Sequence, residues 1–124
     1  MENIDKQIAI KVMGWTEGTD FTFEIYGPQG QFSGVWILDP DSPLGKIPFT
    51  PSTNIAQAFE VAEKMHQQNI WLRNLDFNPY TKKWTACFYH VDKVPHMAVE
   101  ASNVPAAAIC LAALKAIEPG REGG

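Results

Sequence analysis

The run Ile70–Val91, IWLRNLDFNPYTKKWTACFYHV, decides the fold class of this 124-residue chain. We predict strands over residues 70–77 and 84–91, separated by the turn sequence Asn78-Pro79-Tyr80-Thr81. A further strand is expected at residues 97–101, after a short link. Consecutive strands joined by short turns imply an antiparallel sheet.

Helical segments are expected on either side of this run. Apolar residues recur at helical spacing between Asn54 and Gln68, and Asn54 with Gln57 three residues later has the form of a capping box. The stretch from Pro105 to Ile117 is apolar on nearly all sides, which predicts a largely buried helix. The apolar stripe expected for the earlier helix comprises Ile55, Ala58, Phe59, Ala62 and Met65.

The start of the chain also has helical spacing. Ile4, Ile8 and Val12 recur every four residues and predict a helix over residues 3–13. Gly14 supplies a left-handed stop directly after it.

A β-hairpin and a long loop are expected next. Residues 21–26 alternate apolar and polar side chains, which is the period of a strand, and a second strand at 32–38 follows the turn at 27–30. Residues 39–53 contain four prolines. Because proline lacks the backbone N–H, we expect an irregular loop there, with no helix or central strand.

These segments predict an α+β fold in the order α-β-β-α-β-β-β-α. We expect a helix–sheet–helix sandwich with a mainly antiparallel sheet, formed by one domain over residues 1–118. A flexible tail is expected at residues 119–124, which are rich in glycine.

Composition narrows the class of protein. The net charge is −4 and the ten basic residues form no stripe, which disfavours binding to duplex DNA. The acidic, polar start does not fit a signal peptide, and the apolar stretch 104–114 is shorter than the ~20 residues of a membrane span. We therefore expect a cytoplasmic protein with no membrane partner. Cys87 and Cys110 lie in separate apolar runs and are expected to be buried thiols.

Three stretches taken together resemble a known family: IAIKVMGW (8–15), FTPSTNIAQAFEVAEKM (49–65) and AAAICLAALKAIE (106–118). They are similar to the phage ABA sandwich domain family and, more distantly, to NinX-like phage proteins. The resemblance implies a helix–sheet–helix sandwich and a phage or prophage gene, whose product would act in the host cytoplasm. The shared positions are core and capping residues, so the resemblance implies no reaction.

Residues suited to catalysis or metal binding are dispersed. The sequence has no HExxH, HxH or CxxC motif and no phosphate-binding loop motif. His90, Asp92 and His96 lie around one turn and can converge on a metal, although a polar turn explains them equally well. We expect no metal, no cofactor and no enzymatic activity, with an enzyme of unknown chemistry as an alternative.

Aromatic and cationic residues are better candidates for ligand binding. Tryptophan offers a flat stacking face, although packing in the core is the alternative for each one. Strict alternation places Trp71, Arg73 and Leu75 on one strand face, where the arginine can stack on a ring or meet a phosphate. Residues 52–54 lead into a helix N-terminus, which attracts anions, although plain N-capping explains them too. The candidate ligand-binding residues are Trp15, Trp36, Lys46, Ser52, Thr53, Asn54, Trp71 and Arg73.

These features favour a non-catalytic binding protein that counters host defence. One hypothesis is capture of a small anionic ligand, a cyclic or ADP-ribose-type nucleotide that serves as an immune signal. The alternative is a protein-interaction module that inhibits a host defence protein. A homo-oligomer is also expected, because the hairpin or the strand at 97–101 leaves an open sheet edge.

Overall fold

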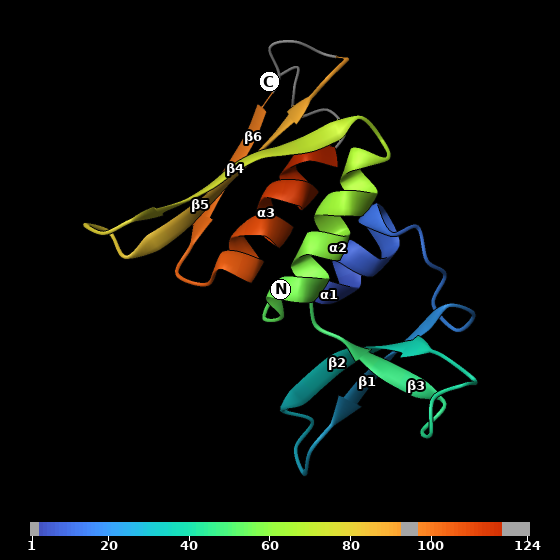
Figure 1. Cartoon of the computed structure of the whole chain (residues 1–124). Coiled ribbons are helices and arrows are strands. Elements are labelled where there is room, and N and C mark those ends of the chain that lie inside the picture. The colour runs from blue at the N-terminus through green and yellow to red at the C-terminus, as the bar shows by residue number, and fades with distance from the viewer. Residues whose placement is uncertain (1–2, 93–96, 118–124) are drawn as a thin grey trace.

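The computed structural model describes residues 3–92 and 97–117 and shows three helices, a π-helical turn and six strands (Figure 1). His96 and the tail at 119–124 lie outside the described residues. In chain order the elements are α1 (Ile4–Gln7), η1 (Ile8–Val12), β1 (Phe21–Tyr26), β2 (Phe32–Leu38), β3 (Lys46–Phe49), α2 (Ile55–His66), β4 (Ile70–Asn78), β5 (Lys83–His90), β6 (Met97–Ser102) and α3 (Pro105–Ile117).

The strands form two antiparallel sheets, β1-β2-β3 and β4-β5-β6, so the predicted α+β class is confirmed. The order differs from the expected one by a single strand, β3, which lies in the proline-rich stretch predicted to be irregular. Pro48 pairs with Trp36 there. Because β3 is an edge strand, the proline nitrogen can face away from the ladder and cost no hydrogen bond.

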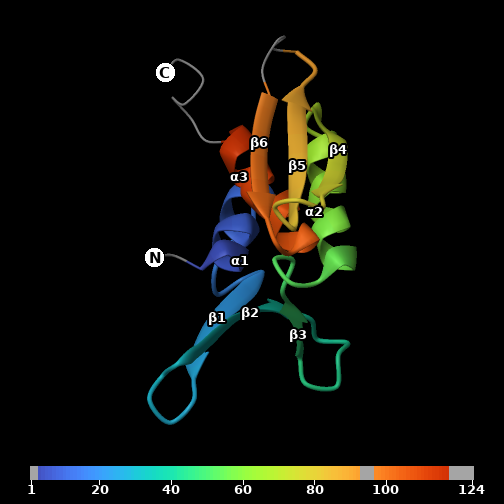
Figure 2. The same ribbon diagram turned by 90° about the vertical axis from the view of Figure 1, so that its left-hand side faces the viewer.

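The helices gather on one side of the β4-β5-β6 sheet. Figure 2 shows α1, α2 and α3 behind this sheet, with no described helix or strand on its other face. Helix α3 is buried along most of its length, as predicted, and its alanines allow close approach to β5 and β6. Phe88 from β5 and Ile109 from α3 are fully buried in the resulting core.

The first sheet meets the same core only at its base. Phe21, Val35 and Phe49 are buried, whereas Ile25 nearer the hairpin turn is 66% exposed. Figure 1 shows this sheet projecting beyond the ends of the helices.

The predicted helix at residues 3–13 is present, and it ends in a π-helical turn. The Asn3 side chain accepts a hydrogen bond of 3.1 Å from the backbone N–H of Lys6, which caps the first turn. The backbone N–H of Met13 donates to the Ile8 carbonyl, five residues earlier. Gly14 follows with a φ of 74°, as expected for a left-handed stop.

A β-bulge at Arg73 corrects the predicted alternation along β4. Leu72 pairs with Phe88 and Asn74 pairs with Cys87, so Arg73 has no opposite residue. Leu72 and Leu75 therefore both pack against the core, although they are three residues apart. The expectation that residues 71, 73 and 75 share one face is wrong, because the extra residue shifts the second half of the strand by one position.

The apolar stripe of α2 also differs from the prediction. Ala58, Val61, Ala62 and Met65 are buried, but Phe59 is 49% exposed. Ile55 is exposed as well. Within residues 3–92 and 97–117, no helix is long and apolar enough to cross a membrane.

Candidate functional site

The predicted ligand-binding residues lie in three separate places. Trp15 and residues 52–54 lie near the start of α2, Trp36 and Lys46 lie on the first sheet, and Trp71 and Arg73 lie on β4. Each group has its own set of contacts, which decide how much of it remains available to a ligand.

The turn before α2 is occupied by hydrogen bonds within the chain. The Asn54 side chain accepts a hydrogen bond of 3.2 Å from the backbone N–H of Gln57, so the predicted N-cap is confirmed. The Gln57 side-chain oxygen accepts one of 2.6 Å from the backbone N–H of Thr50. Nearby, the backbone N–H of Ser52 donates to Oδ1 of Asp5, at 2.9 Å. A carboxyl group of the chain itself thus already accepts the backbone N–H of Ser52, one of the groups that an anionic ligand would use.

Asp5 is a buried carboxyl group whose charge also affects a buried thiol of the core, that of Cys110. It is buried, and burial raises the pKa of its carboxyl group, although the hydrogen bonds to Ser52 act in the opposite direction. Burial, together with the charge of Asp5, raises the pKa of the Cys110 thiol to about 12. Cys87 and Cys110 are both free and buried, as predicted. A thiol held neutral in this way is a poor nucleophile at neutral pH.

Trp15 and Trp36 are engaged in packing. The Trp15 ring meets Phe49 edge-on, with ring centroids 4.9 Å apart, and packs against the core. The ammonium of Lys46 lies 4.8 Å from the centroid of the Trp36 ring and forms an ion pair with Glu24. The cation on the first sheet therefore already has a carboxylate partner.

Trp71 occupies a different position, at the edge of the second sheet. Its side chain is 40% exposed and lies edge-on to His66 of α2, at 4.8 Å between ring centroids, and to Tyr89 of β5, at 6.2 Å. A hollow of about 300 Å³ opens between α2 and β4 beside this ring. The residues that line the hollow are Phe59, Ala62, Glu63, His66, Trp71 and Leu72.

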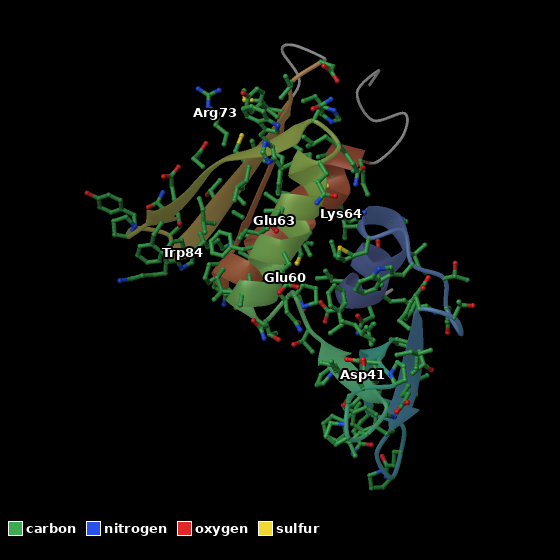
Figure 3. All side chains as sticks on the ribbon, turned by 45° about the vertical axis from the view of Figure 1, so that its right-hand side comes forward. Asp41, Glu60, Glu63, Lys64, Arg73 and Trp84 are labelled. Atoms are coloured by element: carbon green, nitrogen blue, oxygen red, sulfur yellow. The ribbon has the colours of Figure 1, made fainter. Side chains whose placement is uncertain are left out.

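The outer face of the β4-β5-β6 sheet continues from Trp71. The strand register places Trp71, Tyr89 and Met97 side by side, and Val99 lies further along β6. Met97 is 51% exposed, and Nη1 of Arg73 lies 3.6 Å from its sulfur. Figure 3 shows Arg73 extending away from the sheet, and among the described residues no carboxylate pairs with it.

The residues considered for metal binding have structural contacts. Nε2 of His90 lies 2.8 Å from the carbonyl oxygen of Ala116, which ties β5 to the end of α3. Asp92 accepts a hydrogen bond of 3.3 Å from the Asn69 side chain. Among residues 3–92 and 97–117, no three His, Cys, Asp or Glu side chains converge as a metal site would require.

Sequence reasoning identified Trp71 and Arg73 but missed the residues around them. Phe59 was assigned to the buried stripe of α2, and His66 was linked to no site. In α2 the residues Phe59, Glu63 and His66 are spaced by four and three positions, which places them on one helix face. That spacing is the signal by which the α2 side of the hollow can be found.

Comparison with known proteins adds one finding. The family model of the phage ABA sandwich domain matches residues 6–114. No curated protein and no solved structure matches the chain. The more distant similarity to NinX-like proteins stays a prediction. The match covers most of the chain, including all three helices at least in part and all six strands, and the chain belongs to the phage ABA sandwich domain family.

Proposed function

We propose that this phage-family domain is a non-catalytic binding protein that recognises a partner protein through the surface around Trp71. We call this the Trp71 surface, which comprises Phe59, Glu63, His66, Trp71, Arg73, Tyr89, Met97 and Val99. The observation that supports it is a partly exposed tryptophan set between two aromatic rings, at the border of a sheet face that no described helix or strand covers. Tryptophan, tyrosine and arginine dominate the binding energy of protein interfaces, and methionine is enriched there.

The shape of this region favours a protein over a small ligand. Sites for small molecules bury most of the ligand surface in a cleft of roughly 300–1,000 Å³. The hollow beside Trp71 is at the lower end of that range, and the carboxylate of Glu63 lines it. Arg73, the residue predicted to meet a phosphate, reaches instead toward Met97 on the outer face. Capture of a cyclic or ADP-ribose-type nucleotide is thus the less supported form of the proposal.

We further propose that the partner is a host protein and that binding counters a host defence in the cytoplasm. The support is membership of a phage family combined with a surface suited to protein recognition. Self-association to a homo-oligomer would use the same kind of surface. The mass of the purified protein in solution distinguishes a second copy of the chain from a host protein as the partner.

A site-specific crosslinking experiment tests the proposal. A photoreactive amino acid replaces Met97 in one variant and Tyr80, which is 94% exposed at the tip of the β4–β5 hairpin, in a control. Both are expressed in a bacterial host and irradiated. We expect a host protein to crosslink from position 97 and not from position 80, and the crosslink to disappear when Trp71→Ala is added.

Binding to the identified protein must then be measured with purified components. We expect a defined stoichiometry, with affinity at least ten-fold lower for Trp71→Ala than for wild type, in the range of interface hot spots. Trp71→Ala must retain the wild-type melting temperature to within a few degrees. Equal crosslinking from both positions, or a calorimetric titration in which a nucleotide binds with one-to-one stoichiometry, would overturn protein binding as the function.

A further inference from the structure

The two edge strands of the β4-β5-β6 sheet, β4 and β6, differ in the contacts that they make within the described part of the chain. At β6, the ammonium of Lys115 donates a hydrogen bond of 3.3 Å to the carbonyl oxygen of Val99 and lies 3.6 Å from the Glu100 carboxylate. An α3 side chain thus occupies a main-chain acceptor of this edge strand. Charged side chains placed on an edge in this way oppose pairing with another strand.

Among the residues that the structure describes, β4 has no strand partner on its outer edge, although Ile70 is only 6% exposed and Leu72 is half-buried. The backbone N–H of Val91 donates to the Asn69 carbonyl, at 2.9 Å, so residues 69 and 71 direct their main-chain groups toward β5. By the alternation of an antiparallel ladder, Ile70 and Leu72 direct theirs away from β5. Within residues 3–92 and 97–117, no other segment forms a main-chain hydrogen bond with those two residues.

The hollow of the Trp71 surface lies beside this edge, between β4 and α2. Phe59 and Leu72 give it apolar walls, and Trp71 with His66 closes one side. A groove between an edge strand and a helix is the place where extended peptides add to a sheet, with the main chain supplying hydrogen bonds and the hollow selecting a side chain.

Two carboxylates lie on the helix side of this groove, where His66 lines the same hollow and Lys64 follows Glu63 on α2. Glu63 lines the hollow, and Glu60 lies one turn earlier on α2, exposed to solvent; Figure 3 shows the two on successive turns. Among the described residues neither carboxylate has a basic partner within ion-pair distance. Charge complementarity therefore favours a lysine or arginine in the bound segment.

We propose that an extended segment of the partner protein adds to the β4 edge at Ile70 and Leu72, places an apolar side chain in the hollow and sets a basic side chain against Glu63 and Glu60. This inference rests on the proposed function and specifies which part of the partner protein the domain binds. The bulge at Arg73 interrupts the edge, so the added segment is short and its register is fixed.

Selection from a random heptapeptide display library tests this inference directly. We expect the wild-type domain to enrich sequences that combine a lysine or arginine with an apolar residue at even spacing. An enriched peptide should bind Glu63→Gln about five-fold more weakly than wild type, a loss in the range of a partly exposed ion pair. Asp41→Asn is the matched control, because it removes the same charge from the loop between β2 and β3, far from the groove (Figure 3). This control should bind like wild type.

Main-chain pairing has a readout of its own. Addition of the enriched peptide should slow hydrogen exchange at the amides of Ile70 and Leu72, and a version with N-methylated backbone should lose affinity at least ten-fold. No enrichment, enriched sequences without basic residues, or full affinity after N-methylation would overturn the inference. If the crosslink from position 97 still depends on Trp71 in that case, protein binding by the Trp71 surface stands and only the edge-strand mode is wrong.

Discussion

The carboxyl group of Asp5 accepts a hydrogen bond from the backbone N–H of Ser52, 47 positions away, and so joins α1 to the turn that precedes α2. Burial raises the pKa of this carboxyl group in the folded state above its ordinary value of 3.8. Between the unfolded-state pKa and the raised folded-state pKa, Asp5 holds more of its proton in the folded protein than in the unfolded chain. The Asp5 contribution to the free energy of unfolding therefore falls as pH rises through this interval.

Asp5→Asn keeps an oxygen acceptor for Ser52 and removes the charge. We expect this variant to match wild type at pH 3, where the carboxyl group is neutral in both states, and to be more stable at pH 7. Urea unfolding at both pH values measures the difference between the two proteins, which removes the contributions of other carboxylates. A variant less stable than wild type at pH 7 would show that the Asp5 charge is favourable in the fold.

The exposure of Phe59 and the burial of Phe88 predict opposite responses to truncation. Phe88→Ala removes a fully buried ring from the core and should lower the free energy of unfolding by about 3–5 kcal/mol. Phe59→Ala should cost about 1 kcal/mol or less, because half of this ring already faces solvent. Denaturant unfolding of both variants measures the two changes in the free energy of unfolding. Similar losses for the two variants would mean that Phe59 belongs to the core.

The bulge at Arg73 predicts that β4 tolerates loss of one residue. Deletion of Arg73 leaves Leu72, Asn74 and Leu75 in regular in–out–in alternation, so both leucines can still face the core. We expect a folded protein that is less stable by about 1 kcal/mol or less.

Deletion of Ala86 from the partner strand is the control for this change. That deletion shifts the ladder by one residue and moves either Trp84 or Phe88 to the outer face, so the protein should not fold. Circular dichroism and thermal melting distinguish the two deletions. Equal damage from both would mean that the bulge is required for the fold.

The contact of Lys115 with the β6 edge predicts a role in keeping the protein from pairing with itself. Lys115→Ala should alter stability little, because the ion pair with Glu100 is partly exposed. It frees the Val99 carbonyl for another strand, so the mass measured by light scattering should rise with concentration more steeply than for wild type. An unchanged mass profile for Lys115→Ala would contradict this role.

The elements that local sequence determines were predictable. The N-cap at Asn54, the stop at Gly14 and the apolar α3 depend on residues within a few positions of one another, and the structure confirms each of them. The strand at residues 46–49 was not predictable from local sequence, because prolines normally exclude strands. Only the edge position of this strand makes Pro48 acceptable.

The site depends on contacts that no short stretch of sequence contains. The bulge at Arg73 arises from how β4 pairs with β5, and without it the face of every later residue in β4 is assigned wrongly. The edge-on contact of His66 with Trp71 likewise requires that the end of α2 turns back through Asn69, which adopts a φ of 64°. These relationships are set by packing between elements, which periodicity within one element does not encode.

The first sheet is anchored at one end only. Its fixed end is Phe21 and Val35, while Ile25 and Phe32 near the turn stand largely in solvent. Such a ribbon peels from its free end, so its amide protons near Gly30 should be replaced by deuterium well before those beside Val35. A protease that nicks the turn would therefore leave the helices and the second sheet intact, and the nicked protein should still melt cooperatively.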